Sequence, residues 1–339
     1  MVSKTTKEIN SSLQRTPIAI VGMASIFPQA KNMREYWENI LNKVDCITDI
    51  PSSHWNVEDY YDPDPKARDK TYCKRGGFIP KIDFNSLEFG LPPNLLEVTD
   101  VSQILSLIVA KKAMEDANYG ESRQFARDRV GVILGAAAMG AQMSHPYRAR
   151  LESPTWRKVL KSSGVSDEDA EKIIDKVKSA YVEWQENSFP GMLSNIVAGR
   201  IANRLNLGGI NCTLDAACAS SLAALKMAIS QLLEGRCDAM LTGGVDLDNT
   251  VFAYLCFSKT PAISRKQQIR PFDIDGDGML LGEGIGMMVI KRLEDARRDG
   301  DRIYALSKGS RRTAIGCWRK ILRPISRAVQ VRRNPPDCS

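Results

Sequence analysis

The segment best suited to chemistry is residues 211–225, NCTLDAACASSLAAL. An apolar run ends at Asp215, the small residues Ala216 and Ala217 permit a sharp turn, and a helix is predicted to begin at Cys218. Free N–H groups and the positive end of the helix dipole favour a thiolate at such a position. The same N–H groups, including that of Cys218, would stabilise the oxyanion of a thioester intermediate. The segment predicts a nucleophile for acyl transfer, the alternative being a buried structural cysteine.

Metal-binding patterns in the sequence are incomplete. The eight cysteines are widely spaced and include no C-x-x-C pair, which argues against a zinc site. Asp273, Asp275 and Asp277 resemble the opening of a calcium loop, but Gly284 occupies the twelfth position, where a bidentate acid belongs. Asp273 and Glu283 are instead expected to fix loop backbone. No bound metal is predicted.

Partners for a serine nucleophile are also missing. His54 lies in an aromatic loop and His145 in a polar connector, and both are interpreted as surface or packing histidines. Ser220 and Ser221 lie outside any G-x-S-x-G elbow and have no histidine at a plausible position. The sequence therefore argues against a serine hydrolase.

Strand and helix patterns alternate along the chain. Apolar β-branched runs predict buried strands, and apolar residues at helical spacing predict helices between them. This alternation predicts an α/β layered fold with a mostly parallel sheet. The strands are predicted at 17–23, 129–135, 210–215, 239–245 and 285–291, and the helices at 32–42, 101–118, from a Ser166 cap to before Pro190, at 192–205 and at 219–233.

The net charge of +7 is concentrated at one end of the chain. After residue 307 there are nine Lys or Arg and one acidic residue, so the body is close to neutral. Specific nucleic-acid binding is therefore not expected of the body. No apolar run reaches the about 20 residues of a membrane span, and residues 1–16 read as a disordered leader without a secretory core. A cytoplasmic location with reduced thiols is expected.

Several motifs together resemble the β-ketoacyl synthases. DAACASSLAAL at 215–225 is similar to the active-site segment of that family, and AGRIANRLNLGGINC at 198–212 is similar to the stretch before it. The opening PIAIVGM and the later LTGGVDLD and RPFDIDGDGMLLGEG follow the family order. The resemblance runs from residue 17 to 306. The sequences of these motifs are most similar to those of synthases of polyunsaturated fatty acids, enediyne-type polyketides and cyanobacterial glycolipids.

The resemblance implies a fold, a reaction and partners. It implies the N-terminal half of a thiolase-like fold, with Cys218 taking an acyl group from an acyl carrier protein or coenzyme A. A malonyl thioester would then decarboxylate and condense with that group. No tightly bound cofactor is implied, because phosphopantetheine carries the substrates. Phe257 is expected to line the acyl pocket or to be a plain core residue, and the intact family is a homodimer.

The resemblance ends near residue 306. Two histidine motifs of the family's C-terminal half are absent, so the condensing activity of this chain is expected to need a second half supplied by another polypeptide. Residues 307–339 form a basic tail without family motifs, which a lost reading frame would explain; a basic arm that binds anions is the alternative. A third hypothesis is a non-catalytic partner of a complete ketosynthase, against which the retained Cys218 weighs.

Overall fold

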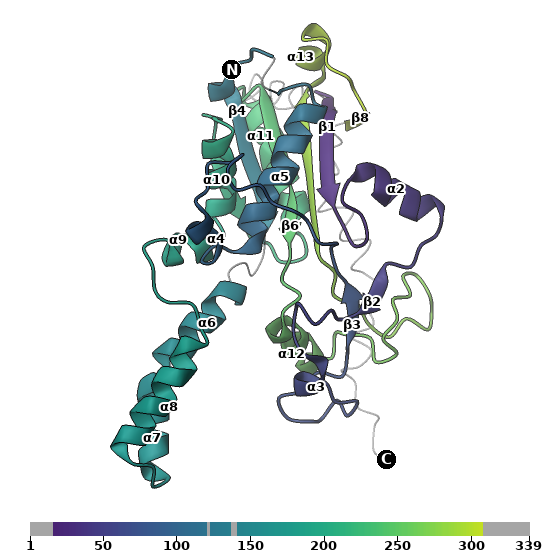
Figure 1. The fold of residues 1–339 in the computed structure, drawn as a ribbon. Coiled ribbons are helices and arrows are strands. Elements are labelled where there is room, and N and C mark those ends of the chain that lie inside the picture. The colour runs from purple at the N-terminus through teal and green to yellow at the C-terminus, as the bar shows by residue number, and fades with distance from the viewer. Residues whose placement is uncertain (1–15, 121–122, 137–140, 308–339) are drawn as a thin grey trace, which may run out of the picture.

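The computed structural model describes residues 16–120, 123–136 and 141–307, and its main element is a six-stranded sheet (Figure 1). The strand order is β5-β4-β6-β7-β1-β8. β4 pairs in parallel with β5 and β6, whereas the β6–β7, β7–β1 and β1–β8 pairs are antiparallel. The strands are β1 (Ile18–Ile26), β4 (Val130–Ala136), β5 (Asn211–Leu214), β6 (Ala239–Asp246), β7 (Gly284–Arg292) and β8 (Ala305–Ser307).

The mostly parallel sheet predicted from the sequence is therefore wrong at these three pairs. The long segment 247–283 brings the chain back to the end of the sheet at which β6 finishes, so that β7 runs in the opposite direction. The sheet is mixed, and the predicted strand positions are confirmed within a few residues.

Helices cover both faces of the sheet, as the layered prediction requires. On one face, α5 (Val101–Asp116) and α10 (Ile196–Arg204) pack against β1 and β4 through buried aliphatic side chains. On the other face, α11 (Ser220–Leu233) packs through Ala224, Ala228 and Leu232 onto Ile133 and Met240. The small side chains on α11 let the helix approach the strands closely.

A smaller lobe lies beyond the end of the sheet where β1 and β6 finish (Figure 1). Its core contains Trp55, Tyr72, Phe78 and Tyr254. Tyr254 is fully buried, and burial raises the pKa of its hydroxyl far above the ordinary value. The lobe contains β2 (Ile47–Asp49), β3 (Arg75–Gly77), α3 (Val57–Tyr60) and α12 (Val251–Lys259).

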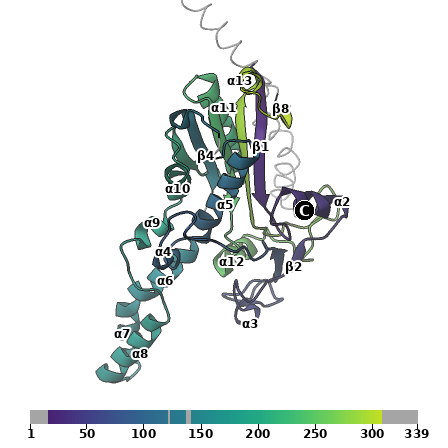
Figure 2. The ribbon, with the colours of Figure 1, turned by 45° about the horizontal axis from the view of Figure 1, so that its top comes forward.

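A helical arm extends away from the sheet in both views (Figures 1 and 2). Ser166 caps α8 by accepting the N–H of Asp169 at 3.1 Å, as predicted, but the helix ends at Ser179 instead of continuing toward Pro190. Trp184 thus lies outside the helix and stacks on Tyr147, with ring centroids 4.2 Å apart. The arm consists of α6 (Ala141–Leu151), α7 (Ser153–Ser162) and α8 (Asp167–Ser179).

The remaining helices of the described residues are short. They are α2 (Met33–Leu41), α4 (Pro93–Leu96), the 3₁₀ turn η1 (Arg127–Arg129), α9 (Ser188–Met192) and α13 (Leu293–Arg298). Among the described residues, none of the helices combines the length and apolar character needed to cross a bilayer. The six cysteines within these residues are free thiols.

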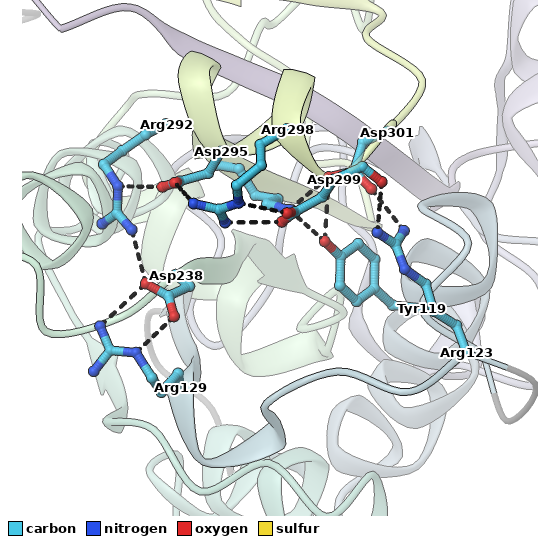
Figure 3. Close-up of polar contacts among 10 residues, drawn as sticks. Tyr119, Arg123, Arg129, Asp238, Arg292, Asp295, Arg298, Asp299 and Asp301 are labelled. Carbon is cyan, nitrogen blue, oxygen red and sulfur yellow. Dashed lines mark hydrogen bonds and ion pairs between the residues drawn. The ribbon is translucent and has the colours of Figure 1, made fainter.

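A chain of ion pairs closes the end of the sheet at which β4 and β6 begin (Figure 3). Lys291 is buried and donates to Asp299 and Asp301, each at 2.6 Å, and to the Tyr119 hydroxyl. Arg123 also donates to Asp301, at 2.6 Å. Burial alone would lower the pKa of Lys291, but these hydrogen bonds outweigh burial and raise it.

The same network extends along the edge to the strand starts (Figure 3). Arg292 bonds to Asp295 and Asp238, and Asp238 in turn accepts from Arg129 at 2.6 Å. These side chains tie the start of β4 and the start of β6 to the end of β7. The leader and the tail predicted for residues 1–16 and 307–339 lie outside the described residues apart from residues 16 and 307.

Candidate functional site

Cys218 lies in the turn between β5 and α11, and its side chain is exposed. Asp215 accepts the N–H of Ala217 at 2.8 Å, and Ser220 Oγ accepts the N–H of Ala216 at 2.9 Å and donates to the carbonyl of Ala217 at 2.6 Å. The helix begins at Ser220 and not, as predicted, at Cys218. Ala217 has a left-handed φ of 49°, so the tight turn extends through Ala219 before helical backbone starts.

Glycines on two strands let the first turn of α11 rest on the sheet. A Cβ at Gly135 of β4 would lie 2.3 Å from the carbonyl carbon of Ser220. A Cβ at Gly244 of β6 would lie 2.9 Å from the Cβ of Ser221. Only glycine fits at Gly135 without moving the helix, so Gly135 and Gly244 set the height of the Cys218 turn above the strand ends. Glycines within strand-like runs were the sequence signal for this close approach, which was not predicted from them.

Cys218 lines a cavity of about 570 Å³ at the ends of four strands. Segments far apart in the sequence form its walls: the end of β1 with Phe27, the ends of β4 and β6, the start of β7, and the first turn of α11. Most of the lining is apolar or glycine, with Met23, Met287 and Leu225 among the larger side chains. Such a concave, largely apolar site suits a ligand with an aliphatic portion.

Two carboxylates contribute to the wall of this cavity, Asp246 and Glu283. Burial raises the pKa of Asp246, and the nearby Glu283 raises it further. Glu283 is buried, and its Oε2 accepts the N–H of Ile79 at 3.0 Å. The expectation that Glu283 fixes loop backbone is confirmed; Asp246 was not identified from the sequence.

The remaining sequence candidates lie elsewhere. Phe257 is on α12 with 37% of its surface exposed, and it is absent from the lining of the Cys218 cavity. Its place in an acyl pocket stays a prediction. Asp273 accepts the N–H of Asp275 at 2.9 Å, as expected for a side chain that fixes a loop. In the part of the chain that the structure describes, no three His, Cys, Asp or Glu side chains are grouped to hold a metal.

The two histidines converge on a second cavity of about 440 Å³. His54 is half-buried and its Nε2 lies 2.7 Å from Oε1 of Glu283, while His145 reaches the cavity from α6. Glu283 lines both this cavity and the one that contains Cys218. The interpretation of His54 as a surface or packing residue therefore omitted its bond to a buried carboxylate.

Comparisons with known proteins agree with these features. A polyunsaturated fatty acid synthase chain of Thraustochytrium sp. is 43% identical over 307 residues, which cover 91% of this chain and 11% of the relative. Polyketide synthase PksN of Bacillus subtilis is 33% identical over 295 residues, which cover 87% of this chain and 5% of the relative. The chain thus spans only a small part of these curated relatives.

Solved structures give the same result. The ketosynthase from module 6 of the bacillaene synthase of Bacillus subtilis superposes with a TM-score of 0.64 at 32% identity, over 86% of this chain and 42% of that one. The PfaC keto synthase–chain length factor superposes with a TM-score of 0.74 at 30% identity, over 86% of this chain and 31% of that one. The family described as "Beta-ketoacyl synthase, N-terminal domain" matches residues 15–296. The fold is that of the N-terminal half of a thiolase-like ketosynthase, and the chain belongs to the β-ketoacyl synthase family.

Proposed function

We propose that Cys218 accepts an acyl group as a thioester in the first step of a β-ketoacyl synthase reaction. The single observation that carries the proposal is the exposed Cys218 turn, which opens into a largely apolar cavity at the ends of four strands. The motif around Cys218 and the ketosynthase relatives support the same role. The acyl donor would be a thioester on the phosphopantetheine of an acyl carrier protein, or on coenzyme A.

The step is a thioester exchange. The Cys218 thiolate attacks the carbonyl carbon of the donor, and the backbone N–H of Cys218 would stabilise the resulting oxyanion. The new bond joins that carbon to Cys218 Sγ, the bond to the pantetheine sulfur breaks, and the released thiolate takes up a proton. No oxidant or metal is required.

Condensation is the second part of the proposal. Loss of CO2 from a malonyl thioester would give a carbanion, which attacks the acyl carbon on Cys218. The bond from that carbon to Cys218 Sγ then breaks, which gives a β-ketoacyl thioester and frees the Cys218 thiolate. Neither His54 nor His145 belongs to the family's two histidine motifs. We therefore propose that the segment around Cys218 carries out the acylation step and that groups outside residues 16–307 promote decarboxylation.

The outer face of α11 supports a partner there. Leu222 and Met227 are 40% and 42% exposed and lie outside the row formed by the packed Ala224 and Ala228, and Leu222 also lines the Cys218 cavity. On α12, Phe252 is 57% exposed. At about 25 cal/mol per Å², each 100 Å² of apolar surface covered would contribute about 2.5 kcal/mol. A C-terminal half-domain of the same family, and a second copy of the chain, are the proposed partners.

Acylation is tested with the full chain and an acyl N-acetylcysteamine thioester. Intact-mass measurement should show one added acyl group, and peptide mapping should place it on Cys218. Cys218→Ser should abolish it, whereas Cys256→Ser, at another exposed cysteine, should leave it unchanged. Equal labelling of the two variants would reject the nucleophile and favour a non-catalytic partner of a complete ketosynthase.

A further inference from the structure

Glu283 is the one residue that lines both the Cys218 cavity and the histidine cavity, among the pockets described. Its side chain is only 3% exposed, and both carboxylate oxygens have partners. Oε1 lies 2.7 Å from His54 Nε2, and Oε2 accepts the N–H of Ile79 at 3.0 Å. Because a carboxylate only accepts hydrogen bonds, Nε2 of His54 carries the hydrogen. The wall shared by the two cavities is thus held by an imidazole–carboxylate pair.

The backbone around Glu283 joins three separate segments. Its N–H donates to the carbonyl of Gly77 at 2.9 Å, and Gly77 donates in return to the carbonyl of Leu281 at 2.9 Å. Asn249, just before α12, donates to the same Gly77 carbonyl at 3.1 Å. The carboxylate adds the loop that contains His54. The start of β7, the end of β3 and the α12 entrance are therefore fixed to one another at this point.

Glu283 lies between two glycines, so its side chain alone can anchor this segment. Gly282 faces open space, and a Cβ at Gly284 would lie 2.7 Å from the Phe27 ring. Glu283 is thus the only residue of the Gly282–Gly284 segment with a side chain to anchor it. All three residues line the Cys218 cavity. Loss of the hydrogen bonds of the Glu283 carboxylate would release residues 282–284 from their fixed place in the cavity wall.

His54 is held in one orientation. Its Nδ1 lies 3.3 Å from the Ser53 hydroxyl, and its ring contacts Phe78 edge-on with centroids 4.8 Å apart. The His54 side chain is 21% exposed. Histidine is the side chain whose charge changes between about pH 5 and 8.

We propose that His54 and Glu283 are a positioning pair that fixes the wall of the Cys218 cavity and sets its charge according to pH. When His54 is protonated, its positive charge cancels that of the Glu283 carboxylate. When His54 is neutral, one uncompensated negative charge remains in the wall and opposes formation of the Cys218 thiolate. The importance of the pair for acylation rests on the proposed function of Cys218. The effect of its charge on the Cys218 thiol can be measured without any acylation.

Other titratable groups also lie near the pair. Asp246 at the end of β6 and Tyr254 of α12 face Glu283, and His145 of α6 lines the cavity of His54. His145→Gln is therefore included as a matched control, because it removes the second histidine of the same cavity and leaves the His54–Glu283 bond in place.

The test measures alkylation of the full chain by iodoacetamide from about pH 5.5 to 8.5, with the rates at Cys218 and Cys256 followed by peptide mass spectrometry. Exposed Cys256 serves as an internal reference. The ratio of the Cys218 rate to the Cys256 rate should fall about two- to fourfold as pH rises through the histidine titration, the effect of one unit charge across roughly 10 Å of partly hydrated protein. His54→Gln keeps a donor for Glu283 and should flatten the ratio, whereas His145→Gln should retain the fall.

Two results would overturn the pair. One is a ratio independent of pH in the unmodified chain; the other is a fall that persists in His54→Gln. Circular dichroism of each variant identifies loss of folding. Glu283→Gln removes the negative charge, so at the alkaline end of the range it should raise the ratio about two- to fourfold, toward the value that the unmodified chain has at acid pH. Failure of the N-acetylcysteamine thioester to acylate Cys218, with the alkylation ratio behaving as expected, would reject the proposed function and leave the pair intact.

Discussion

Replacement of Lys291 by methionine should destabilise the protein more than any other single loss of a lysine charge in the described residues. The ammonium is fully enclosed and bonds to Asp299 and Asp301, each at 2.6 Å, and to Tyr119. The Asp301 side chain has no exposed surface. Methionine fills a similar volume but leaves a buried carboxylate without this cation.

The magnitude follows from what remains. Removal of one partner from a buried pair costs about 3–5 kcal/mol. Arg123 still bonds to Asp301 and Arg298 still bonds to Asp299, which shifts the expected cost down to about 2–4 kcal/mol. In a protein of this size, about 2 °C of Tm accompanies each kcal/mol, which gives a fall of about 4–8 °C.

Thermal unfolding followed by circular dichroism measures this difference against Lys172→Met. Lys172 bonds to Glu168 at 2.7 Å on the surface of α8, with 67% of its side chain exposed, and its loss should cost less than about 0.5 kcal/mol. Should the two variants unfold within about 1 °C of each other, the ion-pair network contributes little and the reasoning is wrong.

Three other features of the structure can be tested by single or paired substitutions. Hydrogen bonds from Arg298 and then from Lys291 lower the pKa of Asp299 to about 2. The charged Asp299 therefore stabilises the folded chain above pH 4, and Asp299→Asn should lose about 1–2 kcal/mol there. This loss should disappear as pH falls toward 2, which urea titrations at stepped pH would measure. Gly135→Ala should slow alkylation of Cys218 and destabilise the fold by about 1–3 kcal/mol, whereas Gly199→Ala in α10, where a Cβ would meet only Asn211 at 3.6 Å, should do neither. Leu222→Ser combined with Met227→Gln should reduce light scattering by the purified chain without lowering its Tm; an unchanged scattering signal would contradict an uncovered apolar face on α11.

Local chemistry made the strands, the helix cap at Ser166 and the position of Cys218 predictable. Each depends on residues within a few positions of one another: an apolar run, a serine followed by acids, or small residues between a strand and a helix. The start of α11 was predicted two residues early because the hydrogen bonds of Ser220 to its own turn compete with helical backbone. The helical spacing of apolar residues, with its period of 3.6, contains no information on the hydrogen bonds that a serine makes to its own turn.

Long-range contacts were beyond the sequence. The antiparallel return of β7 depends on the path of segment 247–283, and nothing in the apolar pattern of a strand specifies its direction. The pairing of His54 with Glu283 joins residues 229 positions apart. Neither residue belongs to a local motif with the other, so their interaction required the folded structure.

The two ends of the sheet use different means to fix their geometry. At the end with Cys218, Gly135 and Gly244 let the first turn of α11 rest directly on the strands beside the cavity. At the opposite end, Lys291 and its carboxylates tie the strands together through charged side chains. An open cavity cannot be filled with stabilising side chains, so the charged network that ties the strands together lies at the opposite end of the sheet from the Cys218 cavity. Substitutions at the ion-pair end should therefore change Tm without changing the reactivity of Cys218 at temperatures well below unfolding, and the His54 and Glu283 variants should change that reactivity with a smaller effect on Tm.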